Sequence, residues 1–326
     1  MLKRRIAEFD VSAIGLGCMS LSHAYGPPPP REQAERVLKG ALDAGYTFLD
    51  TAAVYGLGHN ERLVGEVLKD RRGEFVLASK CGMTDGEQRD LNGAPERLKR
   101  TCDESLARLG VESIDLYYLH RWDKRVPIED SVGALADLVT AGKIKSIGLS
   151  EVSAPTLRKA HAVHPIAALQ TEYSPWTRNP EIAVLDTCRE LGVAFVAFSP
   201  VGRGFLAGGV TDPAQLQQGD FRAGMPRFQG EAFTANLALF EKFAALAASV
   251  GCTPAQLCLA WLLQKDEIII PIPGTTSPAH MEENALAAEI DLEDDVVAEL
   301  EALVNARTVT GARYAPMMQA TVDTEG

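Results

Sequence analysis

The chain has 326 residues, of which 46% are hydrophobic and 23% charged, and its 32 basic and 44 acidic side chains give a net charge of −12. Such a chain can bury a large apolar core, which excludes a small disulfide-stapled protein and an intrinsically disordered one. Because the excess carboxylates repel phosphate backbones and anionic lipids, neither nucleic acid nor a membrane surface is expected as a partner.

Targeting and metal-binding signals are weak. No apolar run approaches the roughly 18 residues of a transmembrane helix, and the first residues lack the apolar segment of a signal peptide, so we expect a cytoplasmic protein. The six cysteines are scattered without C-x-x-C spacing, which indicates reduced, mostly buried thiols. His161 and His164 have no apparent third ligand, so no metal site is predicted.

Short apolar runs alternate with longer amphipathic segments along the chain. Residues 2–11 are predicted to form an N-terminal hairpin. Strands are then expected at residues 14–18, 47–50, 75–79, 114–119, 144–149, 167–170, 194–198 and 268–271. Helices are expected at residues 31–44, 60–69, 94–109, 128–141, 154–163, 180–191, 236–250 and 254–264.

This alternation predicts the fold. Strand-helix repeats require parallel strands joined by right-handed crossovers, and eight repeats close a barrel. We therefore predict an α/β fold, a (β/α)8 TIM barrel that forms one domain over residues 1–326, with the hairpin across the barrel floor. The remaining length is assigned to irregular residues 202–233 and to a C-terminal helix and tail at residues 293–326.

A doubly wound dinucleotide-binding fold is the main alternative, because Gly15-Leu16-Gly17 follows the first apolar run. However, Ser20 stands where the phosphate-binding fingerprint has its third glycine, and a proline-rich loop follows where the fingerprint needs a helix N-terminus. The barrel is therefore favoured.

Catalytic groups of TIM barrels lie at the C-terminal ends of the strands. Here Asp50 ends the second predicted strand, Tyr55 lies in the loop after it, and Lys80 and His120 follow the third and fourth strands. Taken singly, these residues fit a turn cap, a loop aromatic, a surface lysine and a structural histidine. Their convergence at one rim instead predicts an active site.

These four side chains suit proton transfer to or from an oxygen atom. The ammonium of Lys80 stabilises the anion of a phenol, which makes Tyr55 a better proton donor. Asp50 is the counter-ion that a buried lysine needs, and His120 can orient a substrate oxygen. No side chain can supply the hydride that carbonyl reduction requires, so this chemistry implies a nicotinamide cofactor.

The segment around Asp50 and Tyr55 resembles the signature of a known protein family. Residues 45–56 read GYTFLDTAAVYG and are followed by Asn60 and Glu61, a pattern similar to the signature of the aldo-keto reductases. The chain is thereby similar to a bacterial-type NAD(P)H-dependent oxidoreductase over nearly its whole length. Further segments that resemble the family lie at residues 78–80, 115–120, 199–204, 272–276 and 282–284.

The resemblance implies a (β/α)8 enzyme that interconverts carbonyls and alcohols, with Asp50, Tyr55, Lys80 and His120 as the catalytic tetrad. It also implies that Ser150 and Gln170 hold the nicotinamide carboxamide. The other cofactor-binding residues that it implies are Phe198, Ser199, Pro200, Gly202, Arg203, Gly274, Thr275, Thr276, His280, Glu283 and Asn284.

Two positions depart from the family pattern. Glu151 stands where the family commonly has Asn, which places an acceptor where a donor to the carboxamide is expected. Members that prefer NADPH carry Lys or Arg around residues 274–280, whereas this chain offers Thr275, Ser277 and His280. NADPH remains the favoured cofactor, with NADH as the alternative.

The substrate is expected to be a small carbonyl or alcohol, contacted by Tyr25, Trp122 and Trp176 from loops above the barrel mouth. The family also includes regulatory β-subunits of potassium channels, so a cofactor-binding regulatory subunit is the alternative function. A lyase or isomerase that uses Lys80 as a Schiff base leaves Tyr55 and His120 unexplained. The sequence leaves open whether the chain forms homo-oligomers. Substrate loops are expected at residues 22–30, 121–127, 203–233 and 312–326.

Overall fold

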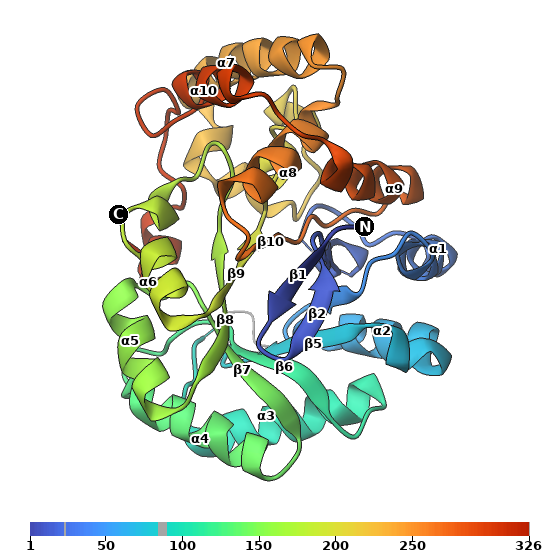
Figure 1. The fold of residues 1–326 in the computed structure, drawn as a ribbon, viewed down its shortest axis with the longest axis vertical. Coiled ribbons are helices and arrows are strands. Elements are labelled where there is room, and N and C mark those ends of the chain that lie inside the picture. Colours follow the sequence, from blue (N-terminus) through green and yellow to red (C-terminus); the bar gives the residue numbers. More distant parts are fainter. Residues whose placement is uncertain (23, 84–89, 326) are drawn as a thin grey trace.

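The computed structural model of this chain describes residues 1–22, 24–83 and 90–325. Residue 23, in the predicted substrate loop 22–30, and residue 326, at the end of the predicted tail, lie outside the described residues. The molecule is a ring of helices around a sheet of parallel strands (Figure 1).

The sheet follows chain order from its first strand to its last, with every neighbouring pair parallel. Its edges meet, because Gly17 and Gly274 form a parallel bridge and the Gly15 amide donates to the Pro271 carbonyl at 2.9 Å. This closure confirms the predicted (β/α)8 barrel. The strands are β3 (Leu16–Gly17), β4 (Phe48–Asp50), β5 (Val76–Cys81), β6 (Ile114–Leu119), β7 (Ile144–Ser150), β8 (Ile166–Glu172), β9 (Ala194–Phe198) and β10 (Ile269–Pro271).

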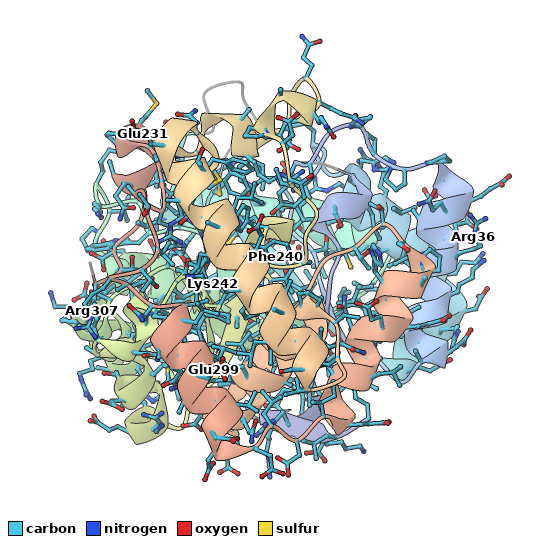
Figure 2. The ribbon with its side chains drawn as sticks, turned by 90° about the horizontal axis from the view of Figure 1, so that it is seen from above. Arg36, Glu231, Phe240, Lys242, Glu299 and Arg307 are labelled. Carbon is cyan, nitrogen blue, oxygen red and sulfur yellow. The ribbon has the colours of Figure 1, made fainter. Side chains whose placement is uncertain are left out.

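The helices that surround the barrel bury their apolar faces against the strands. Two further helices, α7 (Gly230–Ser249) and α10 (Asp294–Leu303), lie side by side outside this ring (Figures 1 and 2). The ring helices are α1 (Arg31–Asp43), α2 (His59–Leu68), α3 (Pro95–Leu109), α4 (Ile128–Thr140), α5 (Ala154–Val163), α6 (Val184–Leu191), α8 (Pro254–Lys265) and α9 (Pro278–Leu286).

The bounds of two predicted helices were wrong, and one helix was not predicted. The helix predicted from residue 236 begins at Gly230, and Pro180 lies in a separate 3-10 turn (Asn179–Glu181) before α6. Helix α9 was missed altogether. Its few apolar residues form no strong stripe, but Ser277 caps its first turn and Pro278 opens it.

An antiparallel hairpin of β1 (Lys3–Ile6) and β2 (Phe9–Ser12) confirms the predicted N-terminal element. Ile6 and Val11 are fully buried against inward-facing side chains such as Phe48 and Ala194, which lie near the starts of their strands. The hairpin therefore closes the end of the barrel opposite to the strand ends that carry the predicted site (Figure 1).

Among the described helices, none alone is long and apolar enough to cross a membrane. Helices α7 and α8 meet this test only as a pair, and they are bent by 79° at the break between them.

The barrel interior is filled by large side chains that need small partners. Tyr118 of β6 lies opposite Gly148 of β7, and a Cβ added at Gly148 would stand 2.3 Å from the Tyr118 ring. Because both residues are in the closely packed centre of the sheet, neither backbone can move away without disturbing neighbouring ladders.

We therefore predict that Gly148→Ala lowers the free energy of unfolding by about 3 kcal/mol, the upper range for an overpacked core. Urea unfolding followed by circular dichroism measures it. Gly133→Ala in α4 is the matched control, because a Cβ there meets nothing within 4 Å and should stabilise the helix by about 0.5–1 kcal/mol. Equal effects of the two substitutions would contradict this packing argument.

Candidate active site

The four predicted catalytic side chains meet at the C-terminal ends of neighbouring strands. Asp50 is the last residue of β4, Lys80 is near the end of β5, and His120 follows β6 directly. Tyr55 comes from the loop between β4 and α2. All four are buried, with Lys80 the most shielded at 1% exposure.

Lys80 is the centre of this group. Its Nζ donates to the Asp50 carboxylate, to the Thr51 carbonyl at 2.8 Å and to the Tyr55 hydroxyl oxygen at 3.3 Å. The rings of Tyr55 and His120 meet edge to face with their centroids 5.8 Å apart. On the far side, the Gln170 amide donates to the second Asp50 oxygen at 2.8 Å.

Burial and neighbouring charges shift the pKa values of Tyr55 and Lys80 in opposite directions. Burial raises the pKa of the Tyr55 phenol, and the Lys80 ammonium opposes that rise only in part, so the phenol holds its proton at neutral pH. Burial lowers the pKa of Lys80, but the charges of Asp50 and Tyr55 and the hydrogen bonds to them together outweigh this effect, and the pKa is raised. Lys80 is therefore a permanent cation beside a protonated phenol.

Buried polar residues hold the loop that carries Tyr55. The Thr51 hydroxyl donates to Asn60 Oδ1 at 2.6 Å, and Asn60 Nδ2 donates to the Cys18 carbonyl and to Ser22 Oγ, both at 2.8 Å. Glu61 accepts bonds at 2.6 Å from Ser79 and from Arg108. The Asn60-Glu61 pair of the sequence motif therefore positions the loop without facing the cavity.

A cavity of about 650 Å³ opens beside Tyr55 and His120 and extends to the segment after β10. This volume is within the usual range of a small-molecule site. Of the residues predicted to bind a cofactor, it is lined by Ser150, Gln170, Phe198, Ser199, Pro200, Arg203, Gly274, Thr275, Thr276 and His280.

Several predicted residues do not line this cavity. Gly202 is buried next to the Trp176 indole, and Glu283 of α9 accepts a bond from Thr253 at 2.8 Å, next to the buried Asn284. Of the predicted substrate residues, Tyr25 lines the cavity. Trp122 does not line it, and its indole N–H donates to the Val126 carbonyl at 2.9 Å.

Trp176 also lies elsewhere, because it stacks on Phe205 with ring centroids 4.6 Å apart in the core under the loop after β9. Its position shows that this tryptophan supports the loop rather than the cavity wall. Among the described residues, no group of three or more His, Cys, Asp or Glu side chains is arranged to hold a metal ion.

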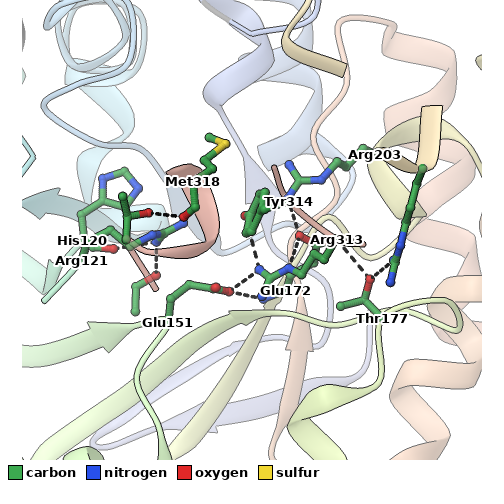
Figure 3. Close-up of polar contacts among 12 residues, drawn as sticks. His120, Arg121, Glu151, Glu172, Thr177, Arg203, Arg313, Tyr314 and Met318 are labelled. Atoms are coloured by element: carbon green, nitrogen blue, oxygen red, sulfur yellow. Dashed lines mark hydrogen bonds and ion pairs between the residues drawn. The ribbon is translucent and has the colours of Figure 1, made fainter. Parts of the chain in front are cut away.

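Glu151 has a different environment from the one that the sequence suggested. Its side chain does not line the cavity but accepts bonds from the Arg313 guanidinium at 2.6 Å and from the Glu172 amide at 2.9 Å. Glu172, two residues beyond Gln170, pairs with Arg203 and with Arg313, whose Nε is 2.9 Å away (Figure 3). Two carboxylates and two guanidiniums thus form one buried cluster.

This cluster anchors the C-terminal tail over the barrel mouth. Arg313 and Tyr314 belong to the tail, and the Arg203 guanidinium donates to the Tyr314 hydroxyl at 2.9 Å. A second anchor is Asp323, which accepts bonds from the Ser153 and Thr156 hydroxyls at the start of α5. The anchored tail brings Tyr314 and Met318 into the cavity wall.

Arg121 also lines the cavity, although the sequence analysis assigned it no role. Its Nη1 donates to the His120 carbonyl at 2.7 Å and to Ser150 Oγ at 3.0 Å (Figure 3). The available signal was its position one residue beyond a strand-end histidine, where the next side chain also faces the barrel mouth. The tail was expected as a substrate loop at residues 312–326, but no periodic pattern precedes Tyr314 and Met318 that could have singled them out.

The sequence profile of the Aldo/keto reductase family matches residues 13–305. The chain is 44% identical over 321 residues to the aldo-keto reductase yakc [NADP(+)] of Schizosaccharomyces pombe, covering 96% of this chain and 94% of the relative.

Solved structures give the same picture. The fold is similar to the glycerol dehydrogenase AKR11B4 from Gluconobacter oxydans, with a TM-score of 0.85, 26% identity and coverage of 96% and 98% of the two chains. It is also similar to the aldo-keto reductase AKR11C1 from Bacillus halodurans, with a TM-score of 0.78, 27% identity and coverage of 97% and 99%.

The tail anchor leads to a prediction on stability. Burial favours a raised pKa for Glu172, but Arg203, Arg313 and Arg227 outweigh it and lower the pKa from 4.5 to about 2. We expect Glu172→Gln to cost about 3 kcal/mol at pH 7, because two buried cations lose a counter-ion. A lowered carboxyl pKa contributes stability above its unfolded value that is lost as pH falls to about 2. The deficit of the variant should therefore shrink across that window, which urea unfolding at pH 7 and pH 3 measures.

Glu190→Gln is the matched control. Glu190 also pairs with an arginine, Arg158, but its side chain is 57% exposed, so its loss should cost less than about 1 kcal/mol. A deficit for Glu172→Gln that is undiminished at pH 3, or equal to the control, would contradict the argument.

Proposed function

Because this chain belongs to the aldo/keto reductase family, we propose that it reduces an aldehyde or ketone to an alcohol with NADPH and that Tyr55 donates the proton. The observation that carries the proposal is the meeting of Asp50, Tyr55, Lys80 and His120 at one end of a cavity large enough for cofactor and substrate. When bound, the reduced nicotinamide supplies the hydride to the carbonyl carbon.

Side chains of the protein donate the proton and orient the substrate oxygen. Tyr55 gives its hydroxyl proton to the carbonyl oxygen, and the Lys80 ammonium, 3.3 Å from that hydroxyl, stabilises the phenolate left behind. Asp50 keeps Lys80 charged and in place. The His120 ring, edge to face with Tyr55, is positioned to donate a hydrogen bond to the same substrate oxygen.

The remainder of the cavity fits the cofactor. Ser150 and Gln170 provide hydroxyl and amide groups near the tetrad, and Phe198 provides an aromatic face on the same wall. At the other end, Thr275, Thr276 and His280 surround the start of α9. The Ser20 hydroxyl, in the cavity wall, is buried and has no hydrogen-bond partner among the described residues, which marks a polar position that a ligand can satisfy.

NADPH is preferred over NADH in this proposal because the relative from Schizosaccharomyces pombe is named for NADP(+). In this chain the groups for a 2′-phosphate are hydroxyls, an exposed imidazole and the N-terminus of α9, which favours anions. Nothing among the described residues or the comparisons favours the regulatory-subunit alternative.

The mechanism predicts distinct effects of two substitutions. Tyr55→Phe removes only the acid, so turnover should fall by at least about 10³-fold while NADPH binding stays within about twofold. Lys80→Met removes the cation that stabilises the phenolate, so kcat should fall by about 10²–10⁴-fold. Steady-state kinetics with a reactive aldehyde measure the rates, and quenching of tryptophan fluorescence measures cofactor binding. Full activity of Tyr55→Phe would overturn the assignment.

The end of the cavity at the start of α9, where the 2′-phosphate is proposed to bind, predicts a gain of function. A guanidinium introduced by His280→Arg can form charge-assisted bonds to a 2′-phosphate, so NADPH should bind about tenfold more tightly. The affinity for NADH, which lacks this phosphate, is the internal control and should change less than twofold. Equal tightening of both cofactors would place the 2′-phosphate away from residue 280.

A further inference from the structure

Among the described residues, three arginines line the cavity, and their electrostatic environments differ. Arg203 is paired with Glu172, and Arg222 is paired with Asp220 at 2.6 Å. No aspartate or glutamate of the described chain forms an ion pair with Arg121. In a protein with an excess of acidic residues, Arg121 therefore presents a cation to the cavity that no carboxylate of the described residues neutralises.

The contacts of Arg121 leave most of its donors available. Both of its hydrogen bonds come from Nη1 and go to uncharged acceptors, the His120 carbonyl and the Ser150 hydroxyl. Its Nε and Nη2 make no hydrogen bond with the described residues, and the side chain is only half-buried. These two nitrogens form one edge of the guanidinium fork, the geometry that binds a carboxylate with two parallel bonds.

The location of this fork relates it to the reaction. Arg121 follows His120 directly and lines the same cavity as Tyr55. Its positive charge also acts to lower the pKa of the Tyr55 phenol, against the larger effect of burial. An anion held by Arg121 therefore lies near the position of the substrate carbonyl. The carboxylate and the carbonyl group of the substrate must then be close together.

We propose that Arg121 binds a carboxylate next to the carbonyl group, so that the preferred substrates are 2-oxo acids, an inference that rests on the proposed reductase function. One unpaired cation matches a monoanion, since the other two cavity arginines are already neutralised. Reduction turns the 2-oxo acid into a 2-hydroxy acid. The carbonyl carbon gains the hydride of NADPH, the oxygen gains the Tyr55 proton, and NADPH becomes NADP+.

The test compares phenylglyoxylate with its methyl ester, which has the same ketone and ring but no charge. For the acid, Arg121→Met should lower kcat/KM by about 10- to 100-fold relative to the wild-type enzyme, because a charge-assisted pair is lost. The ester should change less than threefold between the two proteins. The loss should lie mainly in KM, and Arg121→Lys should restore part of it. Arg100→Met, an exposed arginine of α3, is the control for loss of a positive charge.

Fluorescence titration with NADPH separates this role from another one. Because Arg121 donates to Ser150, it can instead serve the cofactor carboxamide in place of the donor that Glu151 does not provide. In that case Arg121→Met weakens NADPH binding and slows the acid and the ester equally, which overturns the substrate role. If the wild-type enzyme reduces the ester with NADPH and Arg121→Met leaves the acid unaffected, the inference fails alone. If it reduces no carbonyl compound, the proposed function fails.

Discussion

The ion pair between Lys80 and Asp50 is almost completely shielded from water, and the geometry of the site depends on it. Removing two charges from water costs more than their attraction returns unless further hydrogen bonds satisfy them. Here the Thr51 carbonyl, the Tyr55 hydroxyl and the Gln170 amide provide those bonds. A charge that is expensive to bury thus fixes three further groups around it, and the result is a phenol oriented beside a permanent cation.

A second buried cluster uses the same physical principle for a different purpose. Glu151 and Glu172 lie at the ends of adjacent strands and bind Arg313 of the tail. Glu172 also pairs with Arg203, which lies in the loop after β9. Two segments distant in sequence are thereby held against the rigid rim of the barrel. Each of the two buried carboxylates has more than one cationic or amide partner, so several contacts hold the tail over the cavity (Figure 3).

The barrel and the tetrad were predictable because both depend on local patterns. Apolar runs mark strands, a polar residue at the end of a run marks the rim, and Asp50, Lys80 and His120 all follow that rule. The environment of Glu151 was not predictable, because its partner Arg313 is 162 residues away in a segment without periodicity. Trp122 was predicted to line the cavity because it lies in a loop above the barrel mouth, and only its bond to the Val126 carbonyl shows where the ring is held.

The charge of the whole chain and the charge of its cavity are different quantities. A net charge of −12 repels anions at a distance, yet the proposed cofactor and the inferred substrates are both anionic. Attraction must therefore arise within the cavity, where low polarisability strengthens each interaction and bulk solvent screens it less. Pairing Arg203 and Arg222 internally removes their charge from this balance and leaves Arg121, beside Tyr55, as the cation that favours a carboxylate. Selectivity for anionic carbonyl compounds then follows from the one cavity arginine that has no carboxylate partner among the described residues.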